Sequence, residues 1–154
     1  MKMKNKGFTL FIAMIVMGTL LLIASGVVGL AVRQSLISSS GRESQEAFYA
    51  ADSGIECVLY WDVHNPSGTS AFATSTTSNV TCNNQSSTVG GSADVVAGFA
   101  RSVFTFNFAP EPSCVVVTVL KQMAGTATKI ESKGYNTCDP SNARRVERAI
   151  RATY

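Results

Sequence analysis

Charge is absent from a run of 25 residues near the start of this chain, and histidine is almost absent from all of it. Residues 8–32 contain no charged side chain, and His64 is the only histidine. None of the four cysteines belongs to a CxxC pair, so a zinc site is not expected. The serines have no base beside them, and residues 89–94 lack the lysine and spacing of a phosphate-binding loop. We therefore expect no catalytic site, no metal and no cofactor.

An excess of positive charge is also missing from the body of the chain. The formal net charge is +3, and Lys2, Lys4 and Lys6 account for all of it, because the remaining residues hold ten basic and ten acidic side chains. Such a balance does not support general nucleic-acid binding. Lysines before an apolar run usually keep the N-terminus in the cytoplasm. The residues after the run are then expected outside, where four cysteines are able to form disulfides.

The uncharged run 8–32 is long enough to cross a membrane. As an α-helix it would span about 37 Å, more than the roughly 30 Å of bilayer hydrocarbon. A cleavable secretory segment is usually shorter, although small residues at Gly29 and Ala31 leave cleavage there as an alternative. Glycines at 18, 26 and 29 would let neighbouring helices approach closely. The segment is therefore suited to pack against other helices as well as against lipid.

The helix is predicted to continue beyond the apolar run. Within residues 33–62, apolar side chains recur at three- and four-residue spacing, as on one face of an amphipathic helix. We expect a single helix from about Thr9 to Trp61, with a bend or local melting at residues 38–41, where four poor helix formers follow one another. The apolar stripe consists of Ala47, Phe48, Ala51, Ile55, Val58 and Leu59.

The residues Lys6-Gly7-Phe8-Thr9-Leu10, followed by a long apolar helix, resemble the class III signal of type IV pilins and type II secretion pseudopilins. In that family a prepilin peptidase cuts after the glycine and methylates the new N-terminus. The resemblance implies a cut between Gly7 and Phe8, with Phe8 methylated. The stretch QEAFYAADSGIE also resembles the end of the helix in PilX-like minor pilins. The resemblance covers residues 1–62 in detail and the remainder only in architecture.

One position departs from the family pattern. Major subunits carry a glutamate at the fifth mature position, which here is Ile12. In the family this carboxylate is thought to pair with the N-terminal ammonium of a neighbouring subunit, and a buried carboxylate without such a partner is costly. Pseudopilins that lack it are associated with the fibre tip. The resemblance therefore implies a minor or tip subunit rather than a major pilin.

The rest of the chain divides into a polar part and a periodic part. Residues 63–100 are rich in Ser, Thr, Asn and Gly, with Asp94 as the only charged residue, and are predicted to form a long loop. From residue 101 the pattern alternates, with Phe104, Phe106 and Phe108 on one face. Short turns separate the later strands, which favours an antiparallel meander. We predict an α+β fold, in which the long N-terminal helix packs on a three- to four-stranded antiparallel sheet.

The hairpin geometry favours one of three possible disulfide pairings. If residues 123–125 form the turn, Cys114 lies near residue 134, within reach of Cys138 if the chain turns back. Cys57 would then bind Cys82 and tie the end of the helix to the polar loop. Each bridge would close a loop of about 25 residues, which is worth about 3 kcal/mol in the chain-entropy model.

A basic cluster near the C-terminus offers a second interpretation. As a DNA contact it would fit the tip subunit of an uptake pilus. Glu147 interrupts the cluster, and strand alternation places Arg148 and Arg151 on opposite faces. Protection of an edge strand is therefore favoured, and DNA is a less favoured partner. The cluster consists of Arg144, Arg145, Arg148 and Arg151.

These observations lead to one functional hypothesis and two alternatives. The resemblance implies a minor, and by Ile12 a tip, structural subunit of a type IV pilus or type II secretion-like pseudopilus. Its partners would be other pilin subunits, the prepilin peptidase and the assembly platform of the inner membrane. Before assembly it would cross that membrane once, with its N-terminus in the cytoplasm, and afterwards lie in an extracellular fibre or at the cell surface. The alternatives are a single-pass surface-anchored binding protein that never polymerises and a DNA-uptake tip subunit.

The expected segments are a leader at 1–7, a membrane or fibre-core helix at 8–32, an amphipathic helix at 33–62, a polar loop at 63–100 and a sheet at 101–154.

Overall fold

The computed structural model describes residues 6–154. The expected leader, residues 1–7, lies outside this range except for the backbone of its last two residues. The chain forms two compact units, which meet between Gly41 and Arg42 and are described separately below.

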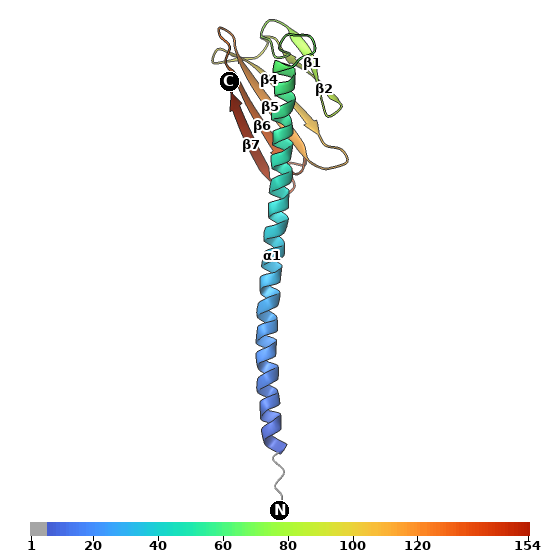
Figure 1. The fold of residues 1–154 in the computed structure, drawn as a ribbon, viewed down its shortest axis with the longest axis vertical. Helices are drawn as coiled ribbons and strands as arrows, with labels where there is room; N and C mark the ends of the chain where they lie inside the picture. The colour runs from blue at the N-terminus through green and yellow to red at the C-terminus, as the bar shows by residue number, and fades with distance from the viewer. Residues whose placement is uncertain (1–5) are drawn as a thin grey trace, which may run out of the picture. The chain divides into compact units, whose positions relative to one another are not determined.

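A single helix, α1 (Lys6–Val63), supplies the first unit and the beginning of the second (Figure 1). The melting expected at residues 38–41 does not occur, because all four residues are helical. Low intrinsic propensity costs less than a kcal/mol per residue for serine, and neighbouring turns on both sides outweigh it. The helix prediction of Thr9 to Trp61 is otherwise confirmed to within three residues at each end.

Two antiparallel sheets complete the second unit. The larger sheet has the strand order β3-β4-β5-β6-β7, so consecutive strands are neighbours, as in the meander predicted from the short turns. This confirms the α+β fold, with the two-residue β3 added to four longer strands. The smaller sheet consists of β1 (Thr77–Cys82) and β2 (Gln85–Gly90); the larger consists of β3 (Val95–Val96), β4 (Phe99–Asn107), β5 (Cys114–Gln122), β6 (Thr128–Tyr135) and β7 (Glu147–Thr153).

The prediction of a loop for residues 63–100 is wrong where β1 and β2 form a hairpin. Val80 and Val89 are buried, while the polar residues that alternate with them face solvent. The turn residues Asn83 and Asn84 both have positive φ, which suits asparagine in a two-residue hairpin turn. The high Ser and Thr content suggested a loop. In β1 and β2, however, only every second residue faces the core, so few apolar residues are needed.

Glycine allows the second half of α1 to lie directly against the sheet. A Cβ on Gly134 of β6 would lie 2.0 Å from the carbonyl oxygen of Ala47 and 2.3 Å from the amide nitrogen of Ala51. A Cβ on Gly54 of α1 would lie 2.1 Å from the Oγ of Ser132. Helix and sheet therefore touch backbone to backbone, at a spacing that no larger residue permits.

A row of phenylalanines fills the core beside this contact. The ring centroids of Phe72 and Phe104 are 6.2 Å apart, and those of Phe104 and Phe106 are 6.4 Å apart. Phe104 and Phe106 are almost fully buried, and Phe108, which follows β4, is half-buried. The period-two pattern in this strand predicted the side that faces the core.

Candidate functional site

The first part of α1 is exposed within the described residues 6–154. Every residue from Phe8 to Val32 is exposed, and this region qualifies by length and hydropathy as a candidate membrane span. A Cβ placed on Gly18, Gly26 or Gly29 would meet no atom within 4 Å. The glycines therefore leave shallow, open positions where another helix is able to approach.

The residues expected to matter for processing lie at the start of this helix. Gly7 is in the first turn, where the backbone is already helical. Phe8 is 66% exposed and Ile12 is 44% exposed. They are four residues apart and so lie on the same side of the helix. Cleavage, methylation and the role of position 12 stay predictions.

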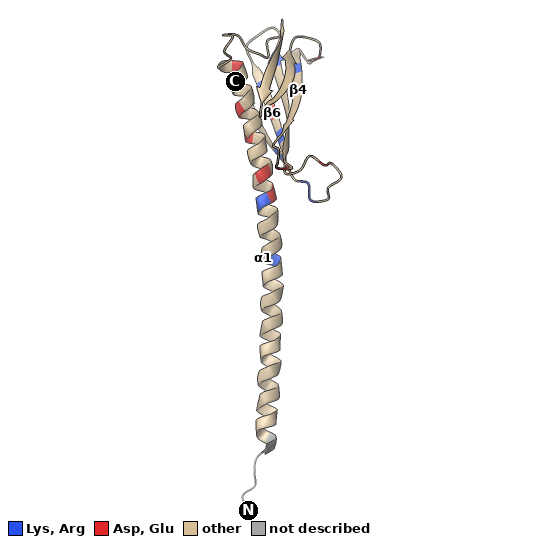
Figure 2. Cartoon of the chain, turned by 90° about the vertical axis from the view of Figure 1, so that its right-hand side faces the viewer, with Lys and Arg blue, Asp and Glu red and all other residues tan. Residues whose placement is uncertain are grey.

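Basic side chains come before acidic ones along α1 (Figure 2). In the sequence, Arg33 and Arg42 precede a series of carboxylates in the second unit. Neither arginine has an ion-pair partner among residues 6–154. The acidic residues after them on α1 are Glu43, Glu46, Asp52, Glu56 and Asp62.

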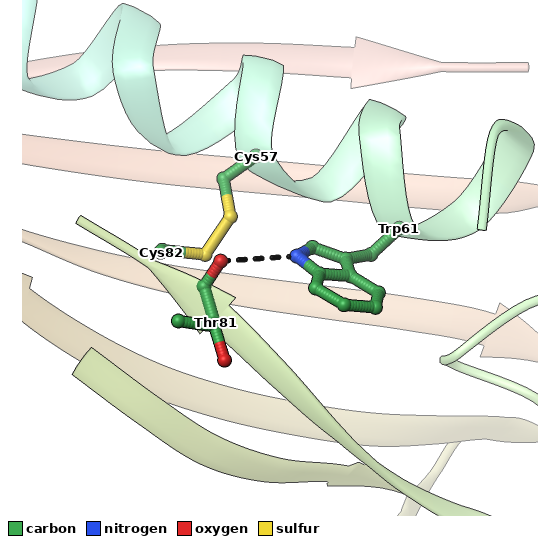
Figure 3. Close-up of a disulfide and its surroundings, with 4 residues drawn as sticks. All are labelled: Cys57, Trp61, Thr81 and Cys82. Atoms are coloured by element: carbon green, nitrogen blue, oxygen red, sulfur yellow. Dashed lines mark hydrogen bonds between the residues drawn. A yellow bond between two sulfur atoms is a disulfide. The ribbon is translucent and has the colours of Figure 1, made fainter. Parts of the chain in front are cut away.

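A disulfide joins the second half of α1 to the β1–β2 hairpin. Cys57 binds Cys82, with Cα atoms 6.0 Å apart. One turn further along the helix, the indole N–H of Trp61 donates to the carbonyl oxygen of Thr81 at 3.2 Å (Figure 3). The bond closes a loop of 25 residues by sequence separation. The β1–β2 hairpin, which was not predicted from the sequence, is therefore linked covalently to α1.

The bond expected between Cys114 and Cys138 is not formed, and both residues are free thiols. Burial first, and then the neighbouring Cys138 thiol, raise the pKa of the Cys114 thiol. Cys114 lies opposite Tyr135 in the β5–β6 register, one residue from the position expected from the hairpin. Cys138 reaches it because its amide donates to the carbonyl oxygen of Pro112 at 2.9 Å. A second disulfide stays a prediction for the oxidised chain.

A buried carboxylate near the end of α1 gathers partners from distant parts of the sequence. The side chain of Asp62 is only 2% exposed, and both of its oxygens accept hydrogen bonds from the Nζ of Lys121, at 2.7 and 2.9 Å. The hydroxyl of Tyr154 donates to the same carboxylate at 2.6 Å, and Ser70 Oγ also donates to it. The cluster joins α1, β5, the segment after the helix and the last residue of the chain.

This cluster also sets the ionisation of its members. Burial alone would raise the pKa of Asp62, but the hydrogen bonds from Lys121, Ser70 and Tyr154 outweigh it and hold the pKa below its ordinary value. Burial and the Asp62 carboxylate raise the pKa of Tyr154. Lys121 also offsets the negative end of the helix dipole, since the last turn has no basic residue of its own. The arrangement links the end of α1 to β5 and to Tyr154.

The basic cluster near the C-terminus is engaged within the chain. Arg151 binds Glu131 at 2.6 Å, and the Nε of Arg148 donates to Ser44 Oγ at 2.8 Å. Arg144 binds Glu43, and the guanidinium of Arg145 lies 3.8 Å from the ring centroid of Tyr135. Arg148 and Arg151 lie on opposite faces of the edge strand β7, in agreement with the alternation. These contacts favour a structural role over a DNA contact.

Two features of the second unit were not predicted from the sequence. They are the close approach of helix and sheet at Gly54 and Gly134 and the carboxylate cluster of Asp62. The only available signal was an acidic residue at a helix end, where acidic residues are unfavourable without a partner. Among residues 6–154, no group of three or more acidic, histidine or cysteine side chains is arranged to hold a metal ion.

Comparison with known proteins gives one match. Residues 6–56 match the family described as PilX N-terminal, which is a structural pilin family of the type IV pilus. Searches of curated proteins and of solved structures gave no match. The matched range ends within the part of α1 that lies on the sheet, and the strands lie outside it. Over residues 6–56 the chain is therefore similar to the N-terminal region of type IV minor pilins.

Proposed function

We propose that this protein is a minor structural subunit of a type IV pilus or of a related type II secretion-like pseudopilus. The observation that carries the proposal is the family match over residues 6–56, which coincides with a helix that is apolar and uncovered in its first part. A helix of this kind suits two environments, the lipid bilayer and the helical core of a fibre. The second unit would remain outside as the exposed domain.

Processing would convert the membrane form into the fibre form. A prepilin peptidase would cut between Gly7 and Phe8 and methylate the new N-terminus. Before assembly, the helix would cross the inner membrane with its N-terminus in the cytoplasm, and the assembly platform would then move it into the fibre. Mass spectrometry of the mature protein tests this directly. We expect N-methylphenylalanine at Phe8, whereas an intact Met1 or a cut near Ala31 would contradict the proposal.

Ile12 supports a position with no subunit ahead, at the tip of the fibre. The position lacks the carboxylate that would bind the N-terminal ammonium of a neighbour. We expect Ile12→Glu to add this contact and to move tagged protein from fibre ends into the shaft. Immunogold labelling of sheared fibres measures the distribution, and Ile12→Leu is the matched control. If labelling of the Ile12→Glu variant stays confined to fibre ends, the proposal that Ile12 determines the tip position would be contradicted.

The two alternatives predict different distributions of the protein. A surface-anchored binding protein that does not polymerise would stay in the membrane fraction and be absent from sheared fibres. A DNA-uptake tip subunit would bind DNA through the C-terminal arginines. Binding that survives replacement of Arg144, Arg145, Arg148 and Arg151 would exclude those residues as the site. The intramolecular contacts of these arginines weigh against the DNA alternative.

A further inference from the structure

An apolar groove lies between the outward face of α1 and the turn that joins β4 to β5. Tyr49 and Ala50 line it from the helix, and Phe108 lines it from the turn, around a volume of about 280 Å³. The ring of Phe108 lies 5.4 Å from that of Phe106, so the groove is the open end of the buried row of phenylalanines. Tyr49 is 65% exposed. The second unit therefore leaves aromatic surface open to solvent at this point.

Two carboxylates border the same groove. Glu46 belongs to α1 and Glu111 to the turn. Within residues 6–154 neither has an ion-pair partner, although Glu43 and Glu131 each bind an arginine. Ser53 and Ser113 add two hydroxyl groups to the lining. The groove thus combines aromatic walls with unmatched negative charge.

We propose that this groove binds an arginine side chain from a neighbouring protein chain. The methylenes of an arginine would pack on Tyr49 and Phe108, and its guanidinium would stack on an aromatic ring and reach the carboxylates. A purely apolar partner would bury Glu46 and Glu111 without compensation, and an anionic partner would be repelled. The charge of the groove therefore selects a cation with an apolar stem.

The chain itself indicates where such a group is found. Arg33 and Arg42 are exposed on α1 and have no ion-pair partner among residues 6–154. A neighbouring helix with the same charge pattern would present an arginine to the groove. This step rests on the proposed function, because it takes the neighbour to be another fibre subunit.

The first experiment tests the chemistry of the groove on the full-length chain in detergent micelles. Nα-acetylarginine amide is titrated against Nα-acetylcitrulline amide, which has nearly the same shape but no charge. We expect saturable shifts in the amide NMR signals of Ser53, Phe108 and Ser113 with the arginine compound, and binding about tenfold weaker with the citrulline compound, equivalent to about 1.4 kcal/mol. Equal affinity for the two compounds, or shifts spread over the whole surface, would overturn the proposal.

Variants identify the groups responsible. Glu46→Gln combined with Glu111→Gln should remove the preference for arginine, because both carboxylates are neutralised without change of size. Glu56→Gln is the matched control, since Glu56 is an exposed carboxylate on the same helix and does not line the groove. Loss of the preference in the control variant, or its persistence in the double variant, would contradict the proposed site.

The second experiment identifies the natural partner in cells. Tyr49 is replaced by the photocrosslinking residue p-benzoylphenylalanine, and crosslinked peptides are sequenced by mass spectrometry. We expect a peptide from a fibre subunit with an arginine near the crosslink, at a yield about fivefold lower in the double glutamine variant. Crosslinks only to lipid, to peptides without arginine, or independent of the two carboxylates would overturn the groove proposal and leave the fibre function standing. An arginine-containing peptide from a protein outside any fibre, with the same dependence on the carboxylates, would support the groove and contradict the fibre function.

Discussion

The two parts of α1 share one backbone helix but differ in what surrounds them. From Phe8 to Val32 every residue is exposed, whereas Ala47, Ala51 and Val58 are completely buried against the sheet. Glycine follows the same division. A Cβ on Gly29 would meet nothing within 4 Å, but one on Gly54 would overlap Ser132. Glycine therefore leaves room for a partner in the first part of α1, whereas in the second part it allows close packing against the sheet.

This difference indicates which interactions stabilise each part. The second part is stabilised by the chain's own sheet, disulfide and buried ion pair. In the first part every residue from Phe8 to Val32 is exposed, and under the proposed function lipid or other subunits would cover this apolar surface. Changes in the second part should therefore alter the stability of the domain, and changes in the first should alter insertion or assembly.

The largest effect is expected from Gly134→Ala. The new Cβ would press on the backbone of α1 at Ala47 and Ala51, which cannot move without separating helix from sheet. We expect the free energy of unfolding to fall by about 3 kcal/mol or more. Urea unfolding of the full-length chain in micelles, followed by the fluorescence of its single tryptophan, Trp61, measures the loss. The control is Gly29→Ala, which should leave the urea midpoint unchanged. Equal effects of the two variants on the urea midpoint would contradict the conclusion that only the second part of α1 is packed against the sheet.

Loss of the Cys57–Cys82 bond should have the next largest effect. Cys57→Ser removes the link between α1 and the β1–β2 hairpin, and the chain-entropy model gives a cost of about 3 kcal/mol for a loop of this length. The same urea experiment measures it, and added reductant should lower the midpoint of the wild-type chain but not that of the variant. A variant as stable as the wild type would indicate that the hairpin is retained by packing alone.

A smaller and pH-dependent effect is expected from Asp62→Asn. The carboxylate is buried and bound by Lys121, but Lys121 is partly exposed, so we expect a loss of about 2 kcal/mol near neutral pH. Because the pKa of Asp62 is lowered by folding, its contribution is complete above the unfolded-state value of about 3.9 and is lost as the pH falls through the lower folded value. The difference in stability between wild type and variant should therefore be constant from pH 5 to 7 and shrink below about pH 4. A difference that does not depend on pH in this range would argue against an ionised Asp62.

Patterns within short stretches of sequence were sufficient for much of this architecture. The uncharged run 8–32 indicated an exposed apolar helix, and the alternation around Phe104 and Phe106 indicated a strand and its buried face. The β1–β2 hairpin escaped detection because its core-facing side has few apolar residues, among them Val80 and Val89. Local pattern is informative where one face must be strongly apolar, and weak where only a few side chains reach the core.

The sequence by itself determined the long helix, the division of that helix into an apolar and an amphipathic part, and the antiparallel strands that follow. Each of these depends on residues a few positions apart, whose side chains share a face through backbone geometry alone. Only the tertiary structure brought Asp62 to Lys121 and Tyr154, and Gly134 to the backbone of α1. These contacts join residues far apart in the chain, and they depend on how closely helix and sheet approach, which no local period encodes. The same packing placed Glu46 and Glu111 in the lining of one groove.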